Sequence, residues 1–210
     1  MYCPAHFRED RLEVQHGFIR SHPLGLLISS GPDGLVANLL PFVLNATDGG
    51  FGVLHAHMAR ANPQWRALDR QAVLVVFRGT DAYVSPSLYA TKQETGKVVP
   101  TWNYAMVQVR GTARLRDQGE WLTPQLQALT TAHEARRTHP WSVTDAPPDY
   151  IEAQKKAIVG IEIDIAALAG KWKVSKNQPE ANRRSVVAAF QADGGTHEMA
   201  ELVRTYGKLE

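Results

Sequence analysis

Three apolar runs follow one another early in the chain with only short turns between them. They span residues 24–29, 35–40 and 51–55, and the segments 30–34 and 45–50 that separate them are rich in Gly, Asp, Asn and Pro. Such segments are typical of hairpin turns. Because strands that follow one another without an intervening helix pair antiparallel, this stretch favours an all-β sheet or barrel.

Further strand signals continue along the chain. The unbroken apolar run 72–77 predicts a strand buried on both faces at the centre of the sheet, and a turn at 79–81 leads into a short strand at 82–86. Residues 107–115 alternate apolar and polar side chains, the pattern of a strand with one wet face. Residues 159–165 alternate in the same way, with an expected inner face of Val159, Ile161, Ile163 and Ile165.

Capping residues and breakers mark helices around this sheet. Asn62 followed by Pro63 is a strong helix start, as is Thr123 followed by Pro124, and Asp149 with Glu152 resembles a capping box. Further helices are expected at 11–22, at 182–192 and at 196–206, the last two separated by a pair of glycines. The fold class is therefore mainly β, with peripheral helices and a C-terminal helical hairpin.

Length and charge narrow the functional classes only slightly. The 210 residues suit one domain with appendages, and 23 Lys and Arg residues balance 21 Asp and Glu residues, so the net charge gives no sign of nucleic-acid binding. The chain has a single cysteine and no apolar run near the ~20 residues that span a bilayer. Its first twenty residues lack the apolar core of a secretory signal, and we expect a cytoplasmic protein.

The segment 100–104 is the first candidate site. It places Pro, Thr, Trp, Asn and Tyr directly before the alternating strand. Flat rings and side-chain hydrogen-bonding groups at the mouth of a strand suit a planar ligand with polar edges. The alternative is a Pro-Thr turn carrying two core aromatic residues.

A second candidate site lies where the strand after residue 50 meets the helix that starts at Asn62. Free backbone N–H groups at a helix start attract anions, and Arg60 would stand beside them with a guanidinium suited to phosphate. The alternative is an ordinary capped helix that binds nothing. His55 and His57 share one face of the strand, but no third ligand follows at a readable spacing, so no metal site is predicted.

Two C-terminal segments each have a plain structural interpretation beside a functional one. The basic stretch 171–178 has the character of a solvated edge. The second C-terminal helix presents His197, Glu198 and Glu201 where a recognition helix needs Arg, Asn, Gln or Lys. Because carboxylates repel phosphates, the charge pattern gives DNA binding no support, and the hairpin is expected to serve packing or dimer contact.

Four motifs in order, at 1–7, 59–65, 100–104 and 172–178, resemble the PaiB family over essentially the whole chain. That family is described as FMN-binding negative transcriptional regulators with the split-barrel fold of pyridoxamine-phosphate oxidases. One departure is Lys176, since the family usually has Gln between the residues that match Ser175 and Asn177. The resemblance implies a split β-barrel of about six to seven antiparallel strands at 1–175, and a helical extension at 176–210.

The resemblance also implies a homodimer that holds FMN between its subunits. The phosphate and ribityl chain are expected along His55, His57, Arg60 and Asn62. The ring is expected to be bordered by Val99, Thr101, Trp102 and Asn103. The residues expected to reach in from the partner chain are Lys173, Ser175 and Asn177.

Three functions follow from the resemblance. The first is an FMN-binding repressor of transcription. The second is a flavin-dependent oxidoreductase acting on a small molecule, in which side chains orient a flavin that does the chemistry. The third is a barrel that has lost flavin and serves as a dimerisation scaffold. The sequence has no nucleophile triad, paired catalytic carboxylates or Walker-type loop, so no catalytic residue is assigned.

Overall fold

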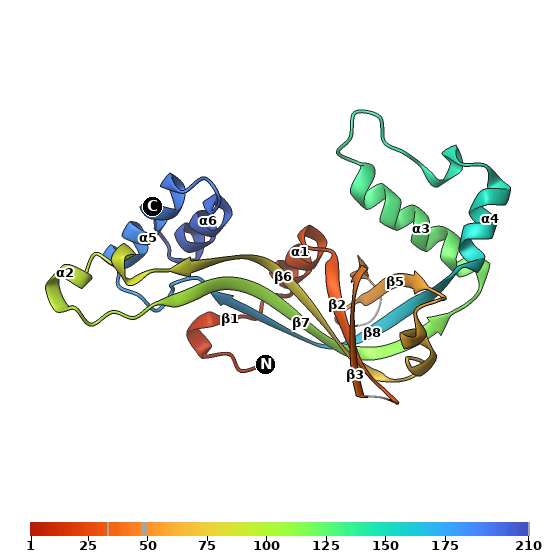
Figure 1. The fold of residues 1–210 in the computed structure, drawn as a ribbon, viewed down its shortest axis with the longest axis horizontal. Coiled ribbons are helices and arrows are strands. Elements are labelled where there is room, and N and C mark those ends of the chain that lie inside the picture. The colour runs from red at the N-terminus through yellow and green to blue at the C-terminus, as the bar shows by residue number, and fades with distance from the viewer. Residues whose placement is uncertain (33, 48–49, 210) are drawn as a thin grey trace. The chain divides into compact units, whose positions relative to one another are not determined.

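The computed structural model describes residues 1–32, 34–47 and 50–209. Within them, strands form one antiparallel eight-stranded sheet in the order β3-β2-β6-β7-β8-β5-β4, with β1 paired to β8 (Figure 1). The strands are β1 (Arg8–Glu9), β2 (Leu24–Gly31), β3 (Gly34–Pro41), β4 (Val43–Asn45), β5 (Val53–Ala59), β6 (Ala72–Val84), β7 (Thr101–Arg116) and β8 (Ile158–Lys173). The predicted turns at 30–34 and 45–50 include residues 33, 48 and 49, which lie outside the described residues.

Helices and short 3₁₀ turns surround the strands. The α-helices are α1 (Leu12–Ser21), α2 (Lys92–Thr95), α3 (Gly119–Glu134), α4 (Pro148–Lys156), α5 (Glu180–Ala192) and α6 (His197–Tyr206). The 3₁₀ helices are η1 (Ala5–Phe7), η2 (Pro63–Ala67), η3 (Pro86–Leu88) and η4 (Val143–Asp145). Among the described residues, no helix has the length and apolar character needed to cross a bilayer. The mainly β fold with a C-terminal helix pair is confirmed.

The chain forms two compact units. Unit 1 holds residues 1–11, 78–107 and 169–210, and unit 2 holds residues 12–77 and 108–168. The long strands β6, β7 and β8 each contribute residues to both units. The expected division of the chain at residue 175 stays a prediction.

Unit 2 has its core on one face of the sheet. Strands β5 and β8 pair with Leu54 opposite Ile163 and with Ala56 opposite Ile161, and all four side chains are fully buried. The predicted inner face of β8 is confirmed, since Val159 and Ile165 are buried as well. Antiparallel partners share a face, so these pairs supply the cross-strand contacts that stabilise the sheet.

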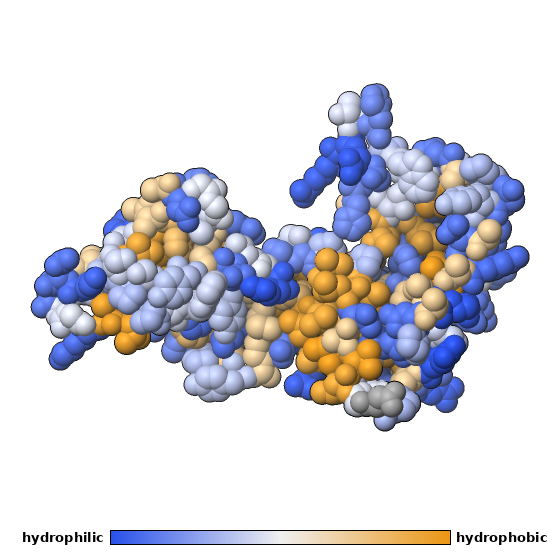
Figure 2. All heavy atoms as spheres, viewed as in Figure 1, coloured by the Kyte–Doolittle hydropathy of each residue, from blue (hydrophilic) through white to orange (hydrophobic). Residues whose placement is uncertain are grey.

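The face of β2, β3 and β6 that turns away from this core carries exposed apolar side chains. Leu26 lies opposite both Leu39 and Val76, so the three side chains share one face. Leu39 is 59% exposed, and Leu24 on the same face is 55% exposed. Figure 2 shows a continuous apolar area over β2 and β3. These strands are therefore apolar on both faces, but only one face is covered by the described residues of the unit.

Two predictions about β6 were wrong. Residues 72–84 form one strand, and the expected turn at 79–81 lies inside it, where Asp81 forms an ion pair with Arg78. The first half is not buried on both faces: Val73, Val75 and Phe77 are buried, whereas the side chains between them are partly exposed. The sequence of β6 looks like that of a strand buried on both faces because its second face is apolar, although that face is not covered.

The helix start predicted at Asn62 and Pro63 is confirmed, although the helix, η2, is a 3₁₀ helix of five residues. Two other helix starts differ from the sequence predictions. Helix α3 begins at Gly119, before Thr123, because its first turn buries Leu122; Pro124 lies inside the helix. Asp149 lies inside α4, which begins at Pro148.

The stretch 171–178 is not a solvated edge. Lys171, Trp172, Val174 and Ser175 are all buried. Strand β1 pairs with β8 at Lys171, and the ring of Tyr206 on α6 lies 5.9 Å from that of Trp172. The alternation of lysine with other residues concealed this burial, because a lysine stem packs along apolar surface while its ammonium group finds a polar partner. That partner is the backbone oxygen of Tyr2, 3.2 Å from Lys171 Nζ.

Close backbone approach gives a test of this packing. A Cβ on Gly111 of β7 would lie 2.3 Å from the backbone oxygen of Asp164 on β8. Because a ladder oxygen cannot move aside without breaking its strand pairing, Gly111→Ala is expected to lower the free energy of unfolding by about 1–3 kcal/mol. Gly17→Ala in α1 meets no described atom within 4 Å and should raise it by about 0.5–1 kcal/mol. Urea unfolding of both variants measures the difference; equal stabilities would contradict the β7–β8 packing.

Candidate functional site

The predicted site residues fall into two groups, one in each unit. The unit 1 group contains Val99, Thr101, Trp102, Asn103, Lys173, Ser175 and Asn177. The unit 2 group contains His55, His57, Arg60 and Asn62.

A pocket of about 190 Å³ in unit 1 gathers most of the first group. Every member except Trp102 lines it, although they come from the two distant segments 99–103 and 173–177. The pocket is also lined by Pro100 of the predicted segment 100–104, and by three residues to which the sequence gave no site role, namely Phe7, Tyr89 and Gln178. The aromatic N-terminal motif was a usable signal for Phe7, whereas nothing in the local sequence marked Tyr89.

A buried polar pair lies at this pocket. Asn103 is fully buried, and its Nδ2 donates a hydrogen bond to Ser175 Oγ at 2.9 Å. Ser175 adopts a left-handed backbone conformation with φ of 58°, which non-glycine residues rarely occupy. Strained residues of this kind concentrate at functional sites, where the surrounding structure holds them. The pair therefore presents a rigid set of donors and acceptors to the pocket.

Lys173 adds a positive charge to the same pocket. Its Nζ donates hydrogen bonds to Thr101 Oγ1 and to the backbone oxygen of Trp102. Burial lowers the pKa of Lys173, and the neighbouring Lys171 lowers it further. The described residues give Lys173 no carboxylate partner, so the pocket combines one cation with neutral hydrogen-bonding groups.

Trp102 lies apart from this pocket. Thr101 and Asn103 line the pocket from one face of β7, and the side chain between them turns to the other face. There the ring of Trp102 meets that of Tyr83 edge to face at 5.7 Å, and Trp102 is 54% exposed. Its predicted role beside a ligand ring stays a prediction.

In unit 2, His55 and His57 project from the same face of β5. His57 Nδ1 lies 3.0 Å from Gln125 Oε1 on α3, and burial lowers the pKa of His57 more than this hydrogen bond raises it. His55 Nε2 lies 3.5 Å from Glu162 Oε2. No local sequence signal connected these partners to β5. Gln125 is on α3 and Glu162 is on β8, so both reach the histidines only through the tertiary fold. Residues 1–32, 34–47 and 50–209 contain no group of three or more metal-ligating side chains.

Arg60 is held by three groups of its own chain. Its guanidinium pairs with Asp117, donates from Nε to the backbone oxygen of Lys156 at 3.1 Å, and donates from Nη2 to that of Ile158 at 3.0 Å. The hydrogen bond that Arg60 donates to Asp117 is the main reason that the pKa of Arg60 is raised. Asn62 acts as the predicted cap, because its Oδ1 accepts from Gln64 N at 3.0 Å. A phosphate at Arg60 would therefore compete with Asp117.

A family model described as "Putative FMN-binding domain" matches residues 1–167. The chain is 30% identical over 206 residues to the Bacillus subtilis "Protease synthase and sporulation protein PAI 2", covering 97% of this chain and 96% of that protein. This similarity extends over both groups of predicted site residues.

Two solved structures resemble the fold at low sequence identity. A conserved hypothetical protein of Mycobacterium tuberculosis has a TM-score of 0.59 at 15% identity, covering 86% of this chain and 95% of that chain. An FAD and heme binding protein of Mycobacterium smegmatis has a TM-score of 0.57 at 16% identity, covering 86% of this chain and 79% of that chain. The predicted split β-barrel fold is confirmed by these similarities in structure.

The lowered pKa of His57 predicts a pH dependence of stability. Because the folded state disfavours the imidazolium, the unfolded state binds more protons between the lowered pKa and the ordinary value of 6.5. The stabilisation is present above pH 6.5 and is lost as the pH falls below it. We expect the free energy of unfolding to fall between pH 7.5 and pH 5.5, and to fall less in His57→Gln. Urea unfolding at pH 7.5 and pH 5.5 measures the change in the free energy of unfolding. His139→Gln, on an exposed loop, should show the same change with pH as the wild type. An equal slope in all three proteins would contradict the burial of His57.

Proposed function

Because the chain belongs to the family described as "Putative FMN-binding domain", we propose that it binds FMN as a homodimer and acts as a negative transcriptional regulator of PaiB type. The observation that carries FMN binding is the convergence of Asn103, Ser175 and Lys173 on one pocket. An isoalloxazine ring has a polar edge of carbonyl and nitrogen groups, and this donor set matches such an edge in chemistry. When bound, the flavin would supply the capacity to accept and give electrons.

The size of the pocket supports a site completed by other residues. At about 190 Å³ it is smaller than the ~300–1,000 Å³ of ordinary small-molecule sites. It can accept one edge of a ligand as large as FMN but not the whole molecule. Lys173, Ser175 and Asn177 were expected to reach in from the partner chain, but they line the same pocket as residues 99–103 of their own chain. We propose that Val99, Thr101 and Asn103 border the ring, and that a second protomer supplies the residues that hold the phosphate.

The β5 group is proposed to hold the phosphate and ribityl chain. His57 is kept neutral by burial and fixed by Gln125, so it offers a hydrogen bond without a charge. Arg60 offers the charge, and its hydrogen bonds to two backbone oxygens keep the guanidinium in place when Asp117 is displaced. Asp117 thus sets a threshold that only a strong oxyanion would overcome.

The uncovered face of β2, β3 and β6 supports the homodimer. Soluble monomers rarely expose contiguous apolar patches larger than a few hundred Å², and larger patches mark association sites. Leu24, Leu39 and the 79% exposed Leu35 lie together on this face with no charged residue opposite them in the strand register. A second copy of the chain would supply a complementary apolar face.

The regulatory role comes from the PaiB relationship and not from a DNA-reading surface. On α6, Glu201 pairs with Arg204, and the other exposed positions are His197, Glu198 and Thr205, none of them Arg, Asn, Gln or Lys. A gel shift with promoter DNA at increasing salt would test direct contact, because counterion release makes phosphate contacts weaken steeply with salt. Binding that is insensitive to salt would exclude a phosphate-contacting surface.

Removal of Arg60 tests the phosphate site. Arg60→Ala is expected to weaken FMN affinity by about tenfold or more, since a charged hydrogen bond to the phosphate is lost. Asp117→Asn should not weaken it, because the competing carboxylate is removed. Arg66→Ala is the matched control, since Arg66 also lies over the Trp65 ring, at 5.6 Å against 5.8 Å for Arg60. Fluorescence titration with FMN measures all three; unchanged affinity in Arg60→Ala would remove Arg60 from the site.

A charge on the exposed apolar face tests the homodimer. Leu39→Glu is expected to convert a dimer of about twice 23.2 kDa into a folded monomer, because Leu39 is already 59% exposed in the single chain. Tyr150→Glu on α4 replaces a side chain of similar exposure, 55%, on another surface and should leave the dimer intact. Light scattering after size-exclusion chromatography gives the masses. A monomeric wild type, or a dimeric Leu39→Glu, would contradict the assigned face.

A further inference from the structure

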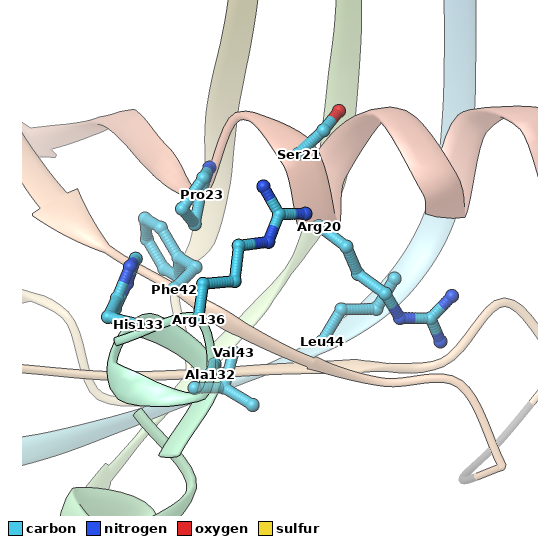
Figure 3. A pocket seen from close by; sticks show the side chains of 9 residues that line it. All are labelled: Arg20, Ser21, Pro23, Phe42, Val43, Leu44, Ala132, His133 and Arg136. Carbon is cyan, nitrogen blue, oxygen red and sulfur yellow. The ribbon is translucent and has the colours of Figure 1, made fainter. Parts of the chain in front are cut away.

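Unit 2 contains a larger pocket that none of the predicted site residues lines. Its volume is about 510 Å³, within the ~300–1,000 Å³ of small-molecule sites. It lies where the end of α1, the β3–β4 junction and the end of α3 come together (Figure 3). The nine residues that line it are Arg20, Ser21, Pro23, Phe42, Val43, Leu44, Ala132, His133 and Arg136.

The floor of this pocket is apolar and rigid. Phe42 and Leu44 are buried, and the ring of Phe42 packs edge to face on that of Phe77 at 5.6 Å. Phe42 N donates a hydrogen bond to the backbone oxygen of Pro23 at 2.9 Å, which ties the floor to the segment that follows α1. A ligand here would contact an apolar surface that is already fixed, so binding would cost little conformational entropy of the protein.

The rim is cationic and contains no carboxylate. Arg20, His133 and Arg136 line it, and the described residues give neither arginine an ion-pair partner. The nearest acid in sequence, Glu134, is engaged elsewhere, by Arg137 Nε at 2.9 Å and by Trp141 N at 3.1 Å. In Figure 3, Arg136 extends from the turn after α3 toward Ser21 at the end of α1. Its guanidinium therefore lies over the pocket with donors to spare.

We propose that this pocket binds a small organic anion, with an aromatic or branched apolar body on Phe42, Val43 and Leu44 and an oxyanion head at Arg136. A planar guanidinium matches a carboxylate or a phosphate in a bidentate geometry. An apolar body is required because inorganic anions gain nothing from a floor of this kind. The pocket shares no residue with the proposed flavin site, although Val43 lies opposite His55 in the β4–β5 register.

Calorimetric titration with three probes of one body size tests the ligand class. The probes are 3-phenylpropionate, 3-phenylpropyl phosphate and the neutral 3-phenylpropanol, with inorganic phosphate as a fourth. We expect at least one aromatic anion to bind with a dissociation constant at least about tenfold lower than those of the alcohol and inorganic phosphate, as the loss of a charged hydrogen bond implies. The tighter of the two anions identifies the head group. Binding of inorganic phosphate as tight as that of both aromatic anions, or binding of neither anion at millimolar concentration, overturns the proposal.

Two neighbouring arginines locate the binding. Arg136→Gln is expected to weaken binding of the aromatic anion by about tenfold or more, while binding of the alcohol is unaffected. Arg137→Gln is the matched control: Arg137 is adjacent and pairs with Glu134 but does not line the pocket, so affinity should stay within about twofold. Val43→Asp, which places a carboxylate on the floor, should abolish anion binding as well. Circular dichroism establishes that each variant is folded. Equal effects of Arg136→Gln and Arg137→Gln, or undiminished binding in Val43→Asp, would overturn the assignment.

Discussion

Burial of apolar surface organises this protein, and strands β2, β3 and β6 carry more of it than the described residues of one chain cover. One face of these strands carries Leu27 and Phe77, both fully buried, while Leu24 and Leu39 on the other face stay more than half exposed. The hydrophobic effect is proportional to the apolar area removed from water, so this second face is an unused source of association energy. The proposed homodimer follows from that imbalance. The proposed flavin site depends on the homodimer in turn, because the unit 1 pocket is too small for the whole cofactor.

The polar groups of the site have hydrogen-bond partners within the chain before any ligand binds. Asn103 and Ser175 satisfy each other at 2.9 Å, and Lys173 is satisfied by Thr101 and a backbone oxygen. Buried polar groups without partners are costly, so a pocket of this kind is stable only if its members are bonded before a ligand arrives. Arg60 follows the same rule with Asp117 as its resident partner. Ligand binding then becomes an exchange of partners, which makes it selective for strong oxyanions.

Local sequence patterns predicted the elements whose burial repeats with a simple period. The alternation of Val159 and Ile161 predicted the inner face of β8, and the helix predicted at 182–192 is α5, which buries Val186 and Phe190. Patterns failed where tertiary contacts decided the outcome. The apolar run in β6 indicated burial on two faces, but the second face is uncovered. The basic stretch after residue 170 indicated solvent, but β1 and α6 bury it. The partner of His57, Gln125, lies 68 residues away and left no local signal. The motifs predicted which residues line the unit 1 pocket, but not that Trp102 would turn to the opposite face of β7.

The central claim is that two copies of the chain together hold one flavin at each shared site. Sedimentation velocity with detection at the flavin absorbance band tests it most directly, because the cofactor can be followed on the species that carries it. The account predicts that FMN sediments only with the dimer, and is released as dilution produces monomer. Flavin that sediments with a monomeric species at full occupancy would contradict it.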